Sequence, residues 1–384
     1  MAAFPNSIHL NIACGQGIPS SQEIRVMLSS CLQPLDPALA ALAATPHSVA
    51  ASMRLHLQSF PDLSGVQLAL VGLPTVAPEI RTQLFGLNWR FGKLVMADLG
   101  NLKPAADRNA TLQGLSEVLA ELHEKGIACI VLGDKEDTRW AQYMAYRHAS
   151  TPLSMAMVLA GLDLENDRSI HRILEHQPSH LFNLNLMATQ ACYMPQPTVD
   201  LLERGHHEHH RLGELRGRME EAEPMLRSAL SFALSIASVR ASDAPGATFN
   251  SPNGLYAEEA ATLARFAGLS PTLSSFLLHD CPAHSLSTIL AAQLIWYFTE
   301  GFAQRYHEWP NAEDPEFIVY RITLRTAGYE IVFYRSKRSN RWWMDVPHPY
   351  EAHSLLLGCS YTDYQSACND ELPERWWRAY QRLL

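Results

Sequence analysis

The segment Leu112-Gln-Gly-Leu-Ser-Glu-Val-Leu-Ala-Glu-Leu-His-Glu-Lys-Gly-Ile-Ala-Cys-Ile-Val-Leu-Gly133 decides the fold class. Its first half places leucine or valine at positions 112, 115, 118, 119 and 122, which is one apolar face of a helix, and Gly126 can end that helix. An apolar run follows at once over 127–133, which is typical of a buried strand in a parallel sheet. A helix that leads directly into a buried strand is the repeating unit of an α/β protein.

The same alternation extends to both sides of this segment. Apolar runs predict further strands at 66–72, 93–100, 154–160, 180–187, 230–236 and 273–278, and periodic stretches predict helices at about 137–148, 167–176, 257–267 and 285–305. We therefore expect a three-layer αβα domain with one mainly parallel sheet over residues 66–305. Residues 1–65 carry few charges, and we expect them to pack on this main domain.

From residue 306 to residue 384 the pattern changes. Alternating segments at 317–323 and 329–335 and a turn at 336–340 predict a small antiparallel extension, which a closing helix ends. The aromatic and basic residues of this extension allow two interpretations, a satellite core with a solvated rim, which we favour, or a stacking and cationic surface for a partner. They are Trp342, Trp343, Trp376, Trp377, Tyr361 and Tyr364, with Arg335, Lys337, Arg338 and Arg341.

Composition limits the classes of partner. The chain has 384 residues, 47% of them hydrophobic, and a net charge of −9, so it can bury a large core and has no basic excess for nucleic acid or anionic lipid. No uncharged apolar run approaches the ~20 residues that span a bilayer, and the first residues lack a signal-peptide pattern, so we expect a cytoplasmic protein without membrane insertion. Seven cysteines without a C-x-x-C pair argue against a disulfide framework or a zinc knuckle.

Polar residues follow several of the predicted strands. Asp134 comes after 127–133, Asp163 after 154–160, Asp243 after 230–236, and His279 after 273–278. The carboxyl ends of parallel strands meet at one edge of a sheet, so catalytic groups of α/β proteins collect there. These are the candidate positions for chemistry.

In order and spacing, these segments resemble the signature motifs of the arginase, agmatinase and formimidoylglutamase (ureohydrolase) family. The matching stretches are Leu132-Gly-Asp-Lys135, Leu159-Ala-Gly-Leu-Asp163, Ser231-Phe-Ala-Leu-Ser235, Pro245-Gly246 and Gly254-Leu-Tyr-Ala-Glu-Glu259, with His279 at the position of a later acidic residue. Within the family the chain is most similar to a divergent group from Bacteroidetes-type bacteria. The resemblance implies an arginase-like fold and, in active members, two divalent ions, usually manganese, bridged by a hydroxide that attacks a guanidinium or amidine carbon.

The six ligand positions that this resemblance carries over hold a single carboxylate. They are Lys135, Leu159, Gly161, Asp163, Ala233 and Ser235. One carboxylate cannot hold two hard cations against hydration, so we expect no metal and no cofactor. The resemblance then indicates a pseudoenzyme, a binding or scaffolding subunit with a protein partner, in which Asp134, Asp163, Asp243 and His279 line a residual pocket. The family's habit of forming trimers and hexamers makes a homo-oligomer a reasonable expectation.

Two other functions stay open. The first is an amidine or guanidino C–N hydrolase with an atypical or single metal site that uses Asp163, His279 or the histidines at 206–210. The second is a metal-free small-molecule sensor.

The histidine-rich segment Gly205-His-His-Glu-His-His210 is the most tempting local metal site. His206 and His210, four residues apart on a helix, could bind zinc, with His207 and His209 beside them, but we favour a solvated helix start.

Three further polar features have a structural interpretation that we prefer. His279, His284 and Asp280 could form a polar pocket, although a capped helix start or a satisfied core histidine is the favoured interpretation. Arg240 and Asp243 are expected to pair and order a loop. Cys281 is an improbable nucleophile.

Overall fold

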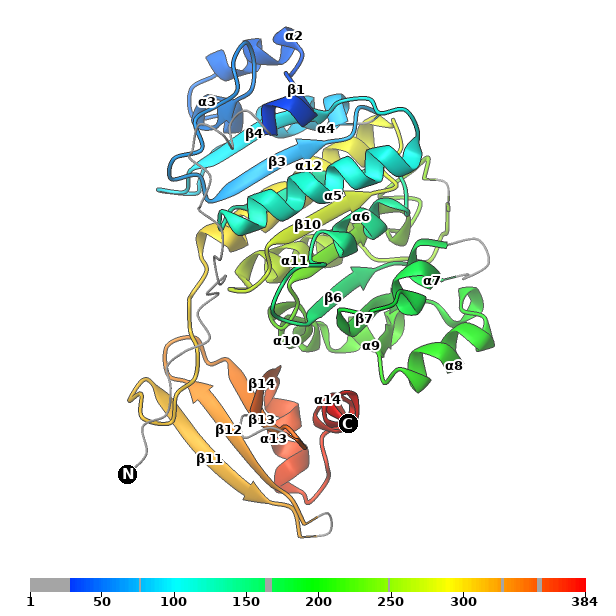
Figure 1. Ribbon diagram of the computed structural model, residues 1–384, viewed down its shortest axis with the longest axis vertical. Helices are drawn as coiled ribbons and strands as arrows, with labels where there is room; N and C mark the ends of the chain where they lie inside the picture. The colour runs from blue at the N-terminus through cyan, green and yellow to red at the C-terminus, as the bar shows by residue number, and fades with distance from the viewer. Residues whose placement is uncertain (1–27, 76, 163–167, 248, 326–327, 351–353) are drawn as a thin grey trace.

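The structure of the protein, a computed structural model, describes residues 28–384 except 76, 163–167, 248, 326–327 and 351–353. The described chain forms two sheets, a large one that carries most of the helices and a smaller one built from the C-terminal residues (Figure 1). This arrangement confirms the predicted α/β fold class with a β-rich C-terminal extension that ends in a helix.

The large sheet is almost entirely parallel. Its strands follow the order β1-β4-β3-β5-β10-β9-β6-β7-β8, and β2 also pairs with β4. Only β1 is antiparallel to its neighbour among the described pairings. The strands are β1 (Leu32–Gln33), β2 (Arg54–Leu55), β3 (Leu68–Gly72), β4 (Met96–Leu102), β5 (Ala128–Leu132), β6 (Leu153–Val158), β7 (Leu181–Thr189), β8 (Glu208–Arg211), β9 (Ser231–Ser235) and β10 (Ser275–His279).

Helices cover both faces of this sheet. On one face, α4 (Ala77–Phe85), α11 (Ala257–Leu269) and α12 (Ser285–Ala303) share a hydrophobic core with one set of strand side chains. On the other face, α5 (Arg108–Glu124), α6 (Thr138–Met144) and α7 (Arg168–Glu175) share a second core with the alternate set. Because successive strand side chains point to opposite faces, a sheet buried on both sides needs apolar residues at nearly every position, as the sequence has.

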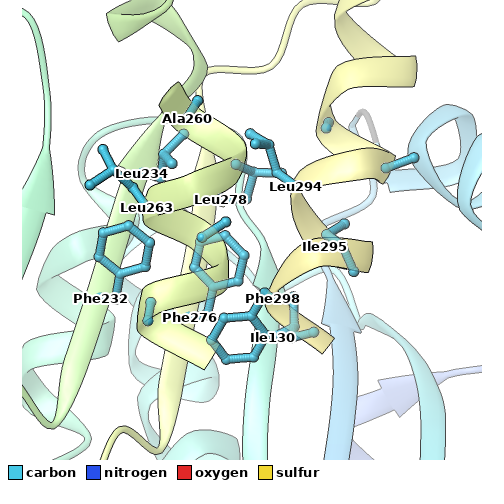
Figure 2. Close-up of a cluster of buried hydrophobic side chains, with 14 of the residues drawn as sticks. Ile130, Phe232, Leu234, Ala260, Leu263, Phe276, Leu278, Leu294, Ile295 and Phe298 are labelled. Carbon is cyan, nitrogen blue, oxygen red and sulfur yellow. The ribbon is translucent and has the colours of Figure 1, made fainter. Parts of the chain in front are cut away.

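Aromatic stacking joins the sheet to α12. The rings of Phe232 on β9 and Phe276 on β10 lie 5.2 Å apart, and Phe276 lies 4.7 Å from Phe298 of α12 (Figure 2). Helices α11 and α12 pack closely because Gly268 and Gly301 lie at their crossing, where a Cβ at either position would overlap the backbone of the opposite helix.

The remaining described helices connect the strands. The short elements between residues 28 and 65 place β1 and β2 beside β4. These connecting elements are α2 (Pro37–Ala40), η1 (Ala41–Ala44), α3 (Val49–Ser52), η2 (Ala191–Tyr193), α8 (Gln196–Arg204), α9 (Leu212–Gly217), η3 (Met219–Glu221), α10 (Ala222–Arg227) and η4 (Ile236–Ser238).

The small sheet is antiparallel, in the order β11-β12-β13-β14. Trp342 and Trp376 are buried in its core, which confirms the satellite-core interpretation for these two side chains, whereas Trp377 is 40% exposed. Strand β14 and helix α13 were not predicted. The elements are β11 (Phe317–Thr323), β12 (Glu330–Ser336), β13 (Trp342–Pro347), β14 (Ser354–Cys359), α13 (Tyr361–Cys368) and α14 (Glu374–Leu383).

Within the described residues, no helix combines the length and the apolar character that crossing a membrane requires.

Candidate functional site

The four strands that precede the candidate positions are neighbours in the large sheet. Strands β5, β10, β9 and β6 follow one another in its order, and all four are parallel. In the register of the sheet, Leu278 of β10 pairs with Leu132 of β5, and His279 pairs with Ser235. The carboxyl ends of these strands therefore meet at one edge, which we call the carboxyl edge.

At the carboxyl edge, two of the carried-over ligand positions belong to the hydrophobic core. Leu159 is 4% exposed and Ala233 is 1% exposed, and both pack in the core that α5, α6 and α7 cover. Lys135 is exposed to solvent, and Asp163 lies outside the described residues. Neither Leu159 nor Ala233 has an atom that can ligate a metal, and their burial leaves these two positions closed to one.

Position 161 cannot supply a metal ligand from its side chain. Glycine has no side chain, and the surroundings of Gly161 leave no room for one. A Cβ added at this position would lie 2.5 Å from Cβ of Tyr193 and 2.6 Å from the carbonyl oxygen of Tyr193. The same carbonyl accepts a hydrogen bond from the backbone N–H of Leu162 at 3.3 Å. A histidine at position 161 would therefore require the backbone at Tyr193 to move.

Arg108 forms ion pairs with the acidic residues that follow β5. The Arg108 guanidinium donates to both carboxylate oxygens of Asp134, at 2.8 Å each, and also pairs with Asp137. Burial raises the pKa of the Asp134 carboxyl, but the hydrogen bonds and charge of Arg108 outweigh burial and lower it. The acidic charge of Asp134 is thus neutralised by the chain itself.

A second polar cluster joins the ends of β9 and β10. The Ser235 hydroxyl donates to Oδ2 of Asp280 at 2.6 Å, and Nδ1 of His279 lies 2.8 Å from the same oxygen. Burial would raise the pKa of Asp280, yet His279, the hydrogen bond from Ser235 and the charge of Arg139 together lower it to about 2. Asp280 adopts a left-handed conformation with φ of 57°, which brings its carboxylate back toward the strand ends.

This cluster lacks the order that nucleophilic catalysis needs. A catalytic serine gives its proton to a histidine, which a carboxylate orients, whereas here the Ser235 hydroxyl donates directly to the carboxylate of Asp280. The nearby thiol is inert, because burial raises the pKa of Cys281 to about 12. The cluster is a polar network that links the ends of two strands through Ser235 and Asp280.

The other candidates at this edge have structural partners. Arg240 pairs with Asp243 at 2.9 Å, as predicted, and Asp243 also accepts the backbone N–H of Ala257 at the start of α11, at 3.0 Å. His284 caps α12 by accepting the backbone N–H of Leu286, which confirms the favoured interpretation of a capped helix start. Asp134, Asp243 and His279 each belong to a network of their own.

The histidine-rich segment lies in an edge strand, so the prediction that it forms a helix is wrong. Gly205 ends α8, His206 takes a φ of 52°, and residues 208–211 pair with β7 as strand β8. This strand was not predicted because its sequence is polar, whereas the predicted strands of the large sheet were recognised by their apolar runs.

Helix α14 contacts the start of the histidine-rich segment. Arg378 donates to the carbonyl oxygen of His207 at 3.0 Å, and Arg382 donates to that of His206. Burial raises the pKa of Glu208, but the hydrogen bond with His210 and the charges of Arg375 and Arg382 lower it to about 2. The start of the segment is thus a docking point for the C-terminal helix.

The described residues do not fit the two manganese ions that the fold implies. No three histidine, cysteine, aspartate or glutamate side chains of the described chain come together in a group that could hold a metal ion. The lack of space for a side chain at Gly161 and the neutralisation of Asp134 by Arg108 also argue against a manganese pair at this edge. The sequence did not predict the roles of Arg108 and Arg139. The carboxylates on which they act, Asp134 and Asp280, are distant from them in the chain or follow a different strand.

Comparison with known proteins shows the fold. No family model and no curated protein sequence matches the chain. Among solved structures, a Trypanosoma cruzi formiminoglutamase with Mn²⁺ is 18% identical with a TM-score of 0.58, over 63% of this chain and 95% of that one. Bacillus subtilis formimidoylglutamase is 14% identical with a TM-score of 0.56, over 62% of this chain and 88% of that one. Bacillus cereus arginase is 14% identical with a TM-score of 0.51, over 61% of this chain and 98% of that one.

These likenesses confirm the arginase-like fold that the motifs predicted. They leave more than a third of the chain unmatched.

We predict that Gly161→Ala destabilises the protein by about 1–3 kcal/mol, because the added methyl group overpacks the backbone at Tyr193. Gly213→Ala is the matched control, since a Cβ there meets nothing within 4 Å, and it should leave stability unchanged or raise it by up to about 1 kcal/mol. Urea unfolding of the three proteins measures both effects. Equal stability of the two variants would show that the space at Gly161 is open.

We also predict a pH-dependent contribution from Asp280. Folding lowers the pKa of its carboxyl from 3.8 to about 2, so the stabilisation is present above pH 4 and is lost as the pH falls toward 2. The difference in unfolding free energy between wild type and Asp280→Asn should shrink by about 1–2 kcal/mol between pH 5 and pH 2.5. Asp200→Asn, at an exposed position of α8, is the control. A difference that does not vary with pH would contradict the network.

Proposed function

We propose that this ureohydrolase-like protein is a pseudoenzyme, which has lost dinuclear metal catalysis and acts in the cytoplasm as a binding or scaffolding subunit for a protein partner. The observation that carries the proposal is the closed carboxyl edge, where Gly161 packs against the backbone of Tyr193 and Leu159 and Ala233 are buried in the core. A pair of metal ions needs several carboxylates and imidazoles directed at one point, and this edge directs apolar groups there instead.

The structural relatives make the contrast concrete. A formiminoglutamase of Trypanosoma cruzi with the same fold contains Mn²⁺. In this chain Arg108 neutralises Asp134 at the corresponding edge, and Asp280 accepts a hydrogen bond from Ser235 and lies in the field of Arg139. Positive charge fixed in the chain replaces the positive charge of metal ions, which supports a stable edge without them.

A second candidate function is an amidine or guanidino C–N hydrolase with a single atypical metal site. The buried His279 beside Asp280 at the carboxyl edge favours it, because an imidazole and a carboxylate are suitable ligands for one ion. This candidate takes Asp163, which lies outside the described residues, as a further ligand. The histidines at 206–210 are less suited to such a site, because Arg378 and Arg382 of α14 donate to the backbone carbonyls of His207 and His206.

We predict that formimidoylglutamate, arginine and agmatine are hydrolysed no faster with the manganese-loaded protein than in buffer alone, with or without a chelator. The reason is that no hydroxide can be activated without its metal pair. The measurement is release of glutamate and formamide from formimidoylglutamate and release of urea from arginine and agmatine, with an active formimidoylglutamase as the positive control for the first substrate.

Turnover that a chelator abolishes and that Asp163→Ala removes would contradict the pseudoenzyme and establish the second candidate. Chelator-sensitive turnover that survives in Asp163→Ala would contradict both, because a pseudoenzyme has no turnover and the second candidate uses Asp163 as a ligand.

A further inference from the structure

A large cleft separates the main domain from the C-terminal sheet, at the end of the large sheet opposite the carboxyl edge. Its volume is about 1330 Å³. One wall consists of α10 and the last turns of α11 and α12, which lead toward the amino ends of strands, and the other consists of the β12–β13 turn and the start of α13. Figure 1 shows the C-terminal sheet beside this end of the large sheet. We call this space the interdomain cleft.

The lining of the interdomain cleft is strongly basic, although the chain as a whole carries a net charge of −9. Six arginines face three glutamates. They are Arg227, Arg265, Arg305, Arg335, Arg338 and Arg341 against Glu220, Glu221 and Glu223. Concentrating positive charge in one concave site focuses the electrostatic field there and attracts anions.

Much of this positive charge lacks a carboxylate partner. Among the described residues, Arg305 donates to the carbonyl oxygens of Gly268 and Leu273, and Arg335 donates to the side-chain amide oxygen of Asn340. Arg338 stacks on the ring of Tyr306, with its guanidinium carbon 4.2 Å from the ring centre. Burial without an ion pair lowers the pKa of Arg305 to about 9, so an anion nearby would relieve an unfavourable charge.

Two buried guanidinium groups of the lining share one carboxylate. Glu223 lies 3.4 Å from Nη2 of Arg227 and 3.0 Å from Nε of Arg341. Arg227 is 3% exposed, and its Nε and Nη1 atoms have no acceptor within the described chain, as is also true of Nη1 of Arg341. These nitrogens are closed to solvent, so they place positive charge behind the lining and do not themselves contact a ligand in the cleft.

The cleft also offers aromatic surface. Tyr306 and Tyr361 are 38% and 54% exposed, and Tyr361 lies 5.7 Å from the buried ring of Trp342. Rings of this kind bind the flat face of a planar group, and arginine forks bind phosphate oxygens in pairs.

We propose that the interdomain cleft binds a small anionic ligand that carries both phosphate and a planar ring, the chemical class of a nucleotide. The arginines of the β12–β13 turn contact the phosphates, the buried Arg227 adds positive charge behind them, and the tyrosines hold the ring. The cleft is large enough for such a ligand together with water, since pockets for drug-sized ligands measure roughly 300–1,000 Å³. The proposal does not depend on the loss of metal catalysis, because the two sites lie at opposite ends of the strands.

The test is calorimetric titration of the full chain with ATP and with pyrophosphate. ATP should bind, pyrophosphate should bind about tenfold more weakly because it lacks the ring, and affinity for both should fall as the salt concentration rises. Arg338→Gln, at an exposed position of the cleft, should weaken ATP binding about tenfold through the loss of a charged donor. Arg321→Gln makes the same change on β11 at a residue that does not line the cleft, and its affinity should equal that of wild type.

Three results would overturn the proposal. They are no binding of ATP at millimolar concentration, equal weakening by the two arginine substitutions, and binding of poly-glutamate in place of ATP, which would assign the cleft to an acidic polypeptide. None of them would bear on the carboxyl edge, and hydrolase activity there would leave ATP binding untouched.

Discussion

The contact between Gly161 and the backbone of Tyr193 is the constraint on which the carboxyl edge depends. It holds the segment after β6 against the segment after β7, so closely that no side chain fits at position 161. In a sheet whose strand ends converge, one closed position affects its neighbours, because ligands for a pair of metal ions must come from several strand ends at once. With Leu159 and Ala233 buried beside it, this edge is continuous with the hydrophobic core.

Electrostatics explain why such an edge is stable. Carboxylates at strand ends repel one another unless cations separate them, and here Arg108 neutralises Asp134 while Asp280 lies in the field of Arg139. At the other end of the sheet the balance is reversed, since arginines exceed glutamates around the interdomain cleft. A chain with negative net charge therefore keeps its unbalanced positive charge where a ligand can reach it. The arginines of α14 and of the β12–β13 turn also join the C-terminal sheet to the main domain.

The sequence predicts those parts of the fold in which a local pattern decides the structure. Most positions in the buried strands of the large sheet are apolar, and these runs predict the strands to within about three residues at their ends. Strand β8 could not be recognised, because Glu208-His-His-Arg211 is polar and becomes a strand only by pairing with β7. The sequence shows that residues 159, 161 and 233 cannot supply the metal ligands of active relatives. It does not show what packs around them, because contacts such as that of Gly161 with Tyr193 join segments that are distant in the chain. The basic residues of the tail were visible too, yet the opposite wall of the cleft comes from α10, α11 and α12.

The central claim is that the carboxyl edge of this arginase-like fold holds no dinuclear metal centre. The most direct measurement is the manganese content of the full chain after equilibrium dialysis against Mn²⁺ and removal of loosely bound ions, determined by mass spectrometry. The account predicts that essentially no manganese stays bound. About two tightly bound equivalents per chain, the stoichiometry of a dinuclear site, would contradict it.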